Sequence, residues 1–396
     1  MMYMRKIFAL MFCVFFLVGS FIVVFNVALV SGLVADSWNT KMCMSQARWG
    51  LGVVEVDGKI YAIGGYDVNG CVGANECYDP VSDSWTFLTS MPTQRACFAI
   101  AAYDGKIYCI GGETRDVTGV RIDLGVNEVY DTVTDSWSTK EPLPVGGTYL
   151  HAGTVNGKIF VIVDHDVAAY DYSQDLYMYN PVTDVWTKKA SMPDLSAPGV
   201  FITLAVVDDT IIVTSAYSLE DALNGRYGYK VMIYDTKTDT WRTGASVSSI
   251  VHFGAAGVTT GDYVPQKVYV IGLASGSDPS LLTNRVYDPT SDTWSHAKTM
   301  PTLRKGFGVA VVNDLIYVIG GYTSNDFSSF SGTTDPSALN EQYVPLGYDG
   351  DNSDNYELKP FSNYITAALV VIIIVTAVII LTLYSKREEK IKKTNY

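Results

Sequence analysis

The sequence predicts an all-β protein, a β-propeller of six blades, because two patterns recur along it. Tryptophans that each follow an Asp-x pair are spaced 47 to 55 residues apart, at Trp38, Trp85, Trp137, Trp186, Trp241 and Trp294. A tyrosine stands seven residues before the last five of them, at Tyr78, Tyr130, Tyr179, Tyr234 and Tyr287. Repeats of this length bury their apolar faces only against neighbouring repeats, so they stack or close into a ring.

Each repeat holds four strands, a to d, joined in part by tight turns. The tyrosine, a polar turn and the tryptophan predict strands c and d. Upstream, Asp57-Gly58 joins two apolar runs, and the second run ends at Gly64-Gly65. Asp-Gly pairs favour hairpin turns, and glycine pairs at a strand end indicate close backbone approach. The same form recurs with Gly111-Gly112 and with Gly320-Gly321.

The count of strands predicts how the ring closes. Units begin near Arg48, Arg95, Thr148, Gly199, His252 and Arg304. The sixth unit supplies strands a to c, ending at Tyr343, and has no tryptophan strand. Asp36-Ser37-Trp38 is a tryptophan strand without a unit of its own. We expect it to complete blade 6, since closure removes open sheet edges.

The order of these signatures resembles the kelch repeat over residues 36–345. Diglycine, Tyr-Asp and tryptophan are followed by Met-Pro and arginine, as in Met91-Pro92-Thr93-Gln94-Arg95 and Met300-Pro301-Thr302-Leu303-Arg304. The resemblance is clear in blades 1, 2 and 6. Blades 3, 4 and 5 carry Val163-Asp164, Ser215-Ala216 and Gly272-Leu273 in place of the glycine pair. The resemblance also implies closure by strand exchange.

Two apolar segments predict export and a membrane anchor. Residues 1–35 contain an uncharged apolar run after Arg5 and Lys6, which reads as a signal peptide or as a retained anchor. Residues 364–384 are long enough to span a bilayer as a helix. The tail, 385–396, holds five Lys/Arg against two Glu, so the positive-inside rule places it in the cytoplasm. The propeller then lies outside the cell, joined by a polar linker, 346–363.

Composition excludes some classes of partner. The net charge is −13, and both the N-terminal start and the tail are basic, so the propeller region is strongly acidic. Such a surface repels nucleic acid. The five cysteines outside the apolar runs are an odd number and follow no zinc spacing. A local bridge between Cys71 and Cys77 is one alternative for them. We expect no metal and no cofactor.

Loop lengths and three arginines suggest where a ligand would bind. The b–c loops are long, at 66–76, 113–126, 217–228 and 322–340, and they share one face with the d–a crossovers. Long loops on a rigid scaffold often carry binding. Arg48, Arg95 and Arg304 begin strand a of three neighbouring blades and could bind an anion there, or could bond to carbonyls between strands. His252 takes the corresponding place in blade 5, as a ligand or a core residue.

The residues favour a binding protein over an enzyme. The four histidines fall at different strand positions, and Glu55, Glu113 and Glu128 show no spacing that singles one out as catalytic. The leading hypothesis is a membrane-anchored extracellular module that binds a protein or a glycan. Some kelch propellers are mutarotases of sugar acids, so the resemblance also implies an alternative: a channel-mouth enzyme acting on an anionic sugar, such as an epimerase or a lyase. A purely architectural envelope component is the third reading.

Overall fold

A computed structural model describes residues 36–164, 174–193, 202–215, 229–247, 252–273, 282–323 and 335–348. The chain divides after Tyr348 into two units, and every described residue belongs to the first. Within these ranges, no helix is long and apolar enough to cross a membrane. The predicted export segment, membrane helix and basic tail lie outside the described residues.

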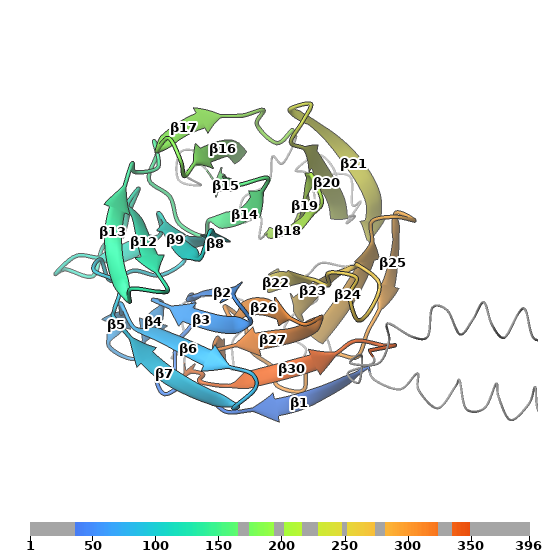
Figure 1. The fold of residues 1–396 in the computed structure, drawn as a ribbon, viewed down its shortest axis with the longest axis horizontal. Coiled ribbons are helices and arrows are strands. Elements are labelled where there is room, and N and C mark those ends of the chain that lie inside the picture. Colours follow the sequence, from blue (N-terminus) through green and yellow to red (C-terminus); the bar gives the residue numbers. More distant parts are fainter. Residues whose placement is uncertain are drawn as a thin grey trace, which may run out of the picture. The chain divides into compact units, whose positions relative to one another are not determined.

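The described part forms six antiparallel four-stranded sheets around a central axis, as Figure 1 shows. Blades 1 to 3 consist of β2 (Gly52–Val56), β3 (Lys59–Ile63), β6 (Asn75–Asp79), β7 (Ser84–Leu88); β8 (Ala99–Tyr103), β9 (Lys106–Ile110), β12 (Asn127–Asp131), β13 (Ser136–Lys140); and β14 (His151–Val155), β15 (Lys158–Asp164), β16 (Gln174–Asn180), β17 (Val185–Lys188). The first strand of each blade lies nearest the axis and the fourth lies at the perimeter.

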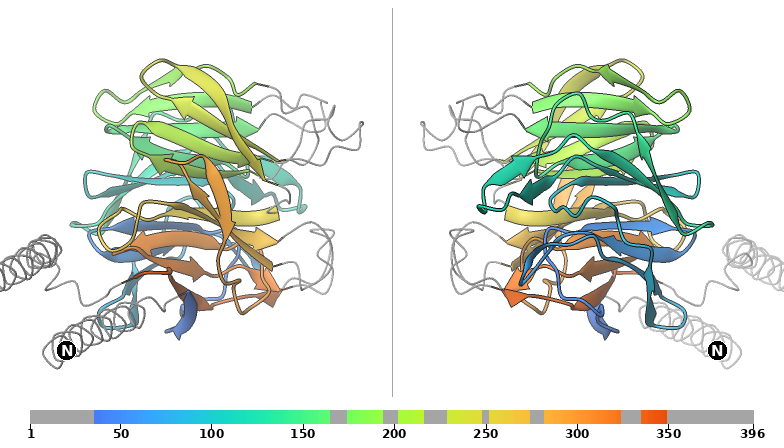
Figure 2. Two further views of the ribbon diagram at one scale, coloured as in Figure 1. Left: turned by 90° about the vertical axis from the view of Figure 1, so that its right-hand side faces the viewer. Right: turned by 90° about the vertical axis from the view of Figure 1, so that its left-hand side faces the viewer.

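Blades 4 to 6 repeat this order. They consist of β18 (Thr203–Val207), β19 (Thr210–Ser215), β20 (Tyr229–Asp235), β21 (Thr240–Val247); β22 (His252–Val258), β23 (Val268–Leu273), β24 (Leu282–Asp288), β25 (Thr293–His296); and β26 (Gly308–Val312), β27 (Leu315–Ile319), β30 (Asn340–Val344), β1 (Ser37–Lys41). Seen from the side in Figure 2, the strands of the blades run from one face of the ring to the other. The predicted six-bladed propeller is confirmed.

The N-terminal strand closes the ring as predicted. Strand β1 pairs antiparallel with β30, and Trp38 lies opposite Tyr343. Asp36, just before β1, accepts hydrogen bonds from the hydroxyl of Tyr343 at 2.7 Å and from the backbone N–H of Lys298 in blade 5 at 2.7 Å. Because these partners lie about 260 and 307 residues away, the first described residues hold blades 5 and 6 together.

The same three-residue joint links every pair of neighbouring blades. The Asp of each Asp-x-Trp accepts from the tyrosine hydroxyl of its own blade and from one backbone N–H of the preceding blade. The tryptophan Nε1 donates to the carbonyl of that same residue. The tyrosine–aspartate pairs, 2.5 to 2.7 Å apart, are Tyr78–Asp83, Tyr130–Asp135, Tyr179–Asp184, Tyr234–Asp239, Tyr287–Asp292 and Tyr343–Asp36.

The core lies between the blades, where β-branched and aromatic side chains of adjacent sheets meet. The glycine pairs allow close approaches between blades, as predicted. Gly64 has φ +62°, and a Cβ there would lie 2.7 Å from the carbonyl oxygen of Arg95 in the next blade. Gly320 meets the carbonyl of Arg48 in the same way, so a larger residue at either position would force the blades apart.

Three of the b–c loops contain short hairpins. These are β4 (Tyr66–Asp67) with β5 (Gly70–Cys71), β10 (Glu113–Arg115) with β11 (Arg121–Asp123), and β28 (Tyr322–Thr323) with β29 (Asp335–Pro336). They stand on the face that the d–a crossovers share, which we call the b–c face. The fourth long loop predicted, 217–228, lies outside the described residues.

Candidate binding site at the central channel

The three arginines predicted as ligand contacts are buried inside the blades. The side chains of Arg48, Arg95 and Arg304 have no exposed surface, and each pairs with a glutamate on strand c of its own blade. Arg48 Nη2 lies 2.9 Å from Glu76, and Arg304 Nη2 lies 2.7 Å from Glu341. Burial lowers the pKa of Arg48, and the charge of Glu76 opposes that shift.

Backbone carbonyls accept from several other donors of these guanidinium groups, whereas the Nε atoms of Arg95 and Arg304 have no hydrogen-bond partner among the described residues. Arg48 donates to the carbonyls of Gly64 and Ala74, both at 2.9 Å, and so holds the two ends of its b–c loop. Arg95 pairs with Glu128 and donates to the carbonyl of Cys109 at 2.8 Å. Of the two roles predicted for these three arginines, the structure therefore shows the structural one, because none of their three guanidinium groups reaches the channel. The anionic-sugar alternative loses the cations on which it depended.

The position of His252 differs from the expected one. In blade 1, Gly52 of β2 pairs with Ile63, which directly precedes the glycine pair Gly64-Gly65. In blade 5, Ala255 of β22 pairs with Ile271, which precedes the equivalent position, so Ala255 corresponds to Gly52. His252 is the first residue of β22, whereas Arg48 lies before β2, which begins at Gly52. A bulge between His252 and Ala255 accompanies the difference. The His252 side chain lies outside the described part, so its role stays a prediction.

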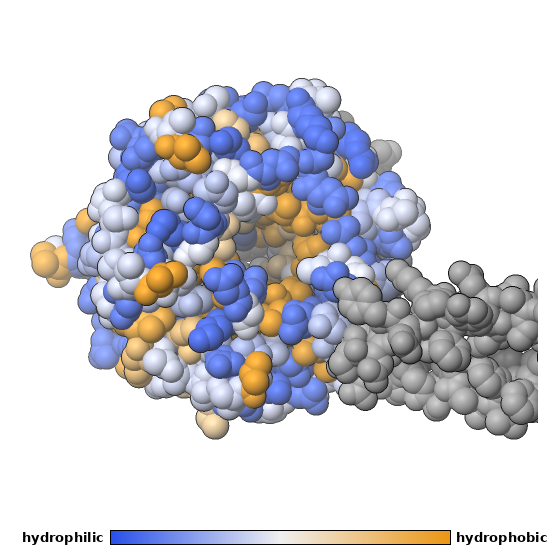
Figure 3. All heavy atoms as spheres, viewed as in Figure 1, coloured by the Kyte–Doolittle hydropathy of each residue, from blue (hydrophilic) through white to orange (hydrophobic). Residues whose placement is uncertain are grey.

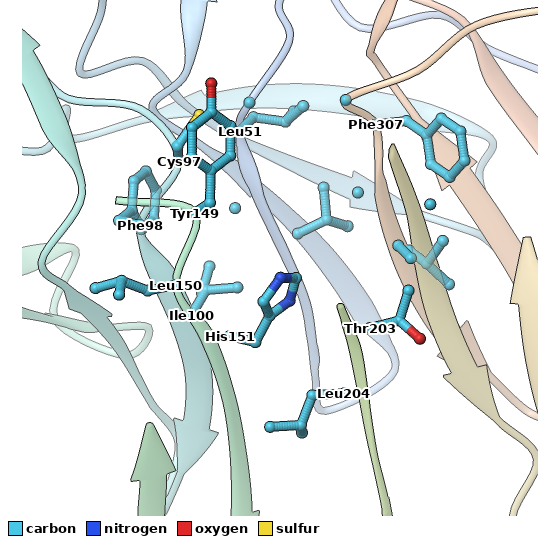
Figure 4. A pocket seen from close by; sticks show the side chains of 18 of the residues that line it. Leu51, Cys97, Phe98, Ile100, Tyr149, Leu150, His151, Thr203, Leu204 and Phe307 are labelled. Atoms are coloured by element: carbon cyan, nitrogen blue, oxygen red, sulfur yellow. The ribbon is translucent and has the colours of Figure 1, made fainter. Parts of the chain in front are cut away.

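A cavity of about 240 Å³ occupies the centre of the ring. Its walls come from the innermost strand of every blade and the residues just before it. Viewed along the axis, Figure 3 shows apolar residues around the central opening. The apolar wall includes Leu51, Phe98, Ile100, Leu150, Leu204 and Phe307, which surround the open space in Figure 4.

His151 is the ionisable side chain that projects furthest into this space in Figure 4. At the corresponding position, blades 1 and 6 carry glycine. A Cβ on Gly52 would lie 2.7 Å from the Phe98 ring, and one on Gly308 would lie 2.2 Å from Val53. In blade 3 the same position carries an imidazole, which faces the cavity. Desolvation lowers the pKa of His151 to about 4, so the ring is neutral at pH 7.

Two strained residues stand at the mouth of the cavity on the b–c face. Cys97 and Tyr149 both have φ +54°, where blades 1 and 6 place Gly50 and Gly306. A bulky residue with positive φ is an outlier that the surrounding structure must enforce. Here backbone hydrogen bonds enforce it, since Cys97 N–H donates to Gly50 O at 2.8 Å and Leu150 N–H donates to Cys97 O at 3.3 Å.

A buried carboxylate ties three blades together beside the mouth. Glu113 of blade 2 accepts from the hydroxyls of Tyr66 in blade 1 at 2.6 Å and Thr148 in blade 3 at 2.7 Å. The ring of Tyr66 stacks on Trp49 at 4.6 Å. Of the other two carboxylates considered from the sequence, Glu128 pairs with Arg95, and Glu55 caps the Asp57-Gly58 turn. All three carboxylates thus have structural partners.

The hairpins of blades 1 and 2 lie side by side and expose apolar side chains. We define the rim patch as Val68, Val117, Val120 and Ile122. Val68 follows β4, and the other three lie in and beside the β10–β11 hairpin. The guanidinium of Arg115 lies over the Tyr66 ring at 5.9 Å and so links the two hairpins. The rim patch is thus an exposed apolar surface on a firm base.

The predicted alternative of a Cys71–Cys77 bridge is wrong in this structure, because all five cysteines have free thiols. Cys71 directs its sulfur to the carbonyl of Glu113 in blade 2, at 3.6 Å. Cys77 is buried in β6 and faces Tyr61 of β3. Within the described ranges, no group of three His, Cys, Asp or Glu side chains is placed to hold a metal ion.

Sequence reasoning missed the residues that line the channel. It followed the arginine positions and overlooked the residue two places later, where Cys97 and Tyr149 replace the glycines of blades 1 and 6. That departure from glycine was the available signal. In the sequence His151 is one of four histidines, and nothing local shows that it faces an axis shared by six blades.

Family models and known proteins match this chain over its central part. Residues 99–321, more than half of the chain, match the KLHDC2/KLHL20/DRC7 kelch-repeats domain, and residues 47–92 match the kelch motif. The chain is 24% identical over 199 residues to kelch-like protein terF of Aspergillus terreus, which covers 48% of this chain and 42% of that protein. It is 28% identical over 198 residues to kelch-like protein 36 of Bos taurus, covering 48% of this chain and 30% of that protein. The matches thus span less than half the length of these relatives.

Among solved structures, the chain is similar to YjhT. The two share 16% identity at a TM-score of 0.57, over 75% of this chain and 95% of that one. At this level of identity the likeness is one of fold.

Proposed function

Because this chain belongs to the kelch-repeat family of β-propellers, we propose that it is a protein-binding module presented on the outside of a cell membrane. The kelch-like relatives support a binding role. The uncharged apolar runs within 1–35 and at 364–384, with the basic tail 385–396, support export and anchoring. The acidic composition argues against nucleic acid as the partner.

The observation that carries the binding role is the rim patch on the b–c face. The buried Arg48 holds both ends of the b–c loop of blade 1, and backbone hydrogen bonds between Ala96 and Glu113 fix the base of the β10–β11 hairpin in blade 2, so both hairpins rise from a fixed base. Val117 is fully exposed and Val68 is 79% exposed, beside the cations Arg115 and Arg121. Exposed apolar side chains next to arginine are typical of protein–protein contact surfaces.

A capture experiment with matched variants tests this surface. The full-length chain, embedded in nanodiscs, serves as bait for surface proteins of its own cell. We expect Val117→Asp with Val120→Asp to abolish capture of a specific protein. Val133→Asp serves as the control, because Val133 is 87% exposed at a c–d turn away from the b–c face. Capture that both variants retain equally would reject the rim patch. Binding to a glycan array in place of any protein would favour the glycan partner.

The membrane topology has a separate test. A C-terminal epitope tag is added to the tail, and intact cells are treated with trypsin. We expect the propeller to be digested while the tag stays protected until the membrane is opened. A tag that is cleaved in intact cells would contradict the proposed orientation. Intact mass of the purified chain distinguishes a cleaved signal peptide from a retained anchor.

A further inference from the structure

The central cavity has the chemistry of a small-molecule site that is separate from the rim patch. Its volume of about 240 Å³ is far more than one water needs, which is roughly 10–15 Å³ on the same measure. Ligand sites in proteins are usually apolar with a few placed polar groups. Here Leu51, Phe98, Leu150 and Phe307 form the apolar wall.

The polar side chains Cys97, Tyr149, His151 and Thr203 of the cavity are neutral at pH 7 and come from blades 2, 3 and 4. His151 and Thr203 come from the neighbouring blades 3 and 4, and Tyr149 stands above them at the mouth (Figure 4). The hydroxyls of Thr203 and Thr214 share a 2.6 Å hydrogen bond, which fixes the Thr203 side chain. Among the described residues that line the cavity, none is Lys, Arg, Asp or Glu. A bound anion would find no countercharge among these described residues.

The strained backbone at the mouth points the same way. Cys97 and Tyr149 keep a left-handed conformation in which glycine would be unstrained, as Gly50 and Gly306 are in blades 1 and 6. Asp and Asn adopt this region readily in turns, but a bulky residue held in it is a strained position of the kind that clusters at functional sites. The result at this mouth is a sulfur and a phenol beside the opening, as Figure 4 shows.

We propose that the channel binds a small uncharged molecule, mostly apolar, that carries a hydrogen-bonding group directed at His151. An aromatic or alicyclic alcohol is of this class. The apolar wall takes the ring, and the imidazole accepts from or donates to the hydroxyl. A carboxylate on the same ring is disfavoured, because burying an unpaired charge costs far more than burying a neutral polar group. The proposal does not depend on which protein the rim patch binds.

Two matched probes test the charge selection. The full-length chain is titrated calorimetrically with p-cresol and with p-hydroxybenzoate, which share the ring and hydroxyl and differ in the carboxylate. We expect p-cresol to bind at least tenfold more tightly. Equal affinities for the two probes, or no binding of p-cresol by the folded chain, would overturn the proposal.

Paired variants then locate the site. His151→Phe fills the space beside the apolar wall, so p-cresol affinity is expected to fall at least tenfold. His296→Phe, at an exposed position on β25, is the matched control and is expected to bind p-cresol as the unaltered chain does. Uptake of the probe into detergent or lipid is common to both variants, so their difference reports the channel. Unchanged affinity in a folded His151→Phe chain would contradict the assignment.

Photolabelling covers the case in which His151→Phe does not fold. An uncharged phenyl diazirine is activated on the unaltered chain, and excess p-cresol is added in a parallel sample. We expect label on peptides containing residues 49–53 and 149–152, reduced by p-cresol. Label confined to other peptides would reject the site.

Discussion

Blades 6, 1 and 2 keep a buried ion pair, whereas blades 3, 4 and 5 do not show it among the described residues. In the first group an arginine before strand a pairs with a glutamate on strand c, at Arg304–Glu341, Arg48–Glu76 and Arg95–Glu128. In blade 3 the register puts Gly147 at the arginine position. The perimeter joint of tyrosine, aspartate and tryptophan, by contrast, recurs in all six blades.

This difference indicates that the perimeter and the channel side of a blade have separate structural roles. The perimeter joint fixes each blade to its neighbour and cannot vary without opening the ring. Each arginine pairs with a glutamate of its own blade, and Arg48 also holds both ends of its b–c loop, so a blade can lose the arginine without losing the perimeter joint. The blades without it place His151 and Thr203 against the cavity, and the blades with it carry the rim patch.

The largest expected effect comes from breaking an arginine pair. Arg48→Ala leaves Glu76 buried without its countercharge, and we expect a loss of about 3–5 kcal/mol in the free energy of unfolding. Lys188→Ala in blade 3 is the contrast. Lys188 is half exposed where it pairs with Asp175, so about 1 kcal/mol or less should be lost. Urea unfolding followed by tryptophan fluorescence measures both. Equal losses would erase the distinction between the two groups of blades.

Opening the perimeter joint is expected to cost somewhat less. Asp36→Ala removes the acceptor of two hydrogen bonds and places alanine at φ +53°. At about 1 kcal/mol for each of these three terms, the loss is roughly 3 kcal/mol. Asp135→Ala removes the same contacts inside the ring and should cost a similar amount. A much smaller loss of stability for Asp36→Ala than for Asp135→Ala would show that strand β1 does not hold the ring shut.

Acid should weaken the channel side through His151. Its pKa is about 4 in the folded chain and near 6.5 in the unfolded one, so the unfolded chain binds more protons between these values. Stability contributed by the neutral imidazole is therefore lost as pH falls through this window, by about 2 kcal/mol from pH 7 to pH 5. His151→Gln should remove that part of the pH dependence. Chemical unfolding of both chains at the two pH values measures it, and parallel pH profiles would argue that His151 is solvated.

The smallest effect concerns the mouth residues. Gly306→Ala puts a side chain at φ +64° in blade 6, for which we expect a loss of about 1 kcal/mol. Cys97→Gly relieves the same strain in blade 2 and should change stability by less than about 1 kcal/mol. Thermal unfolding of the two variants side by side would detect the difference in sign or size. A Cys97→Gly chain that is strongly destabilised would show that the thiol is needed for packing.

Repeat spacing and turn residues determined much of this molecule without any coordinates. The interval between tryptophans set the number of blades, and the lone Asp36-Ser37-Trp38 strand set the way the ring closes. These features can be predicted from the sequence because strand pairing and turn geometry depend on residues close in the sequence. The glycine pairs also indicated close backbone contacts between blades, since only glycine tolerates them.

Only the tertiary structure determined the direction in which the side chains of the recurring arginines point. Arg48, Arg95 and Arg304 turn into their blades because Glu76, Glu128 and Glu341, 28 to 37 residues later, neutralise them there. Likewise, Cys97, Tyr149, His151 and Thr203 face one cavity only after several blades have closed around the axis. Spacing within a repeat carries local geometry, whereas burial and charge pairing depend on partners that folding brings near.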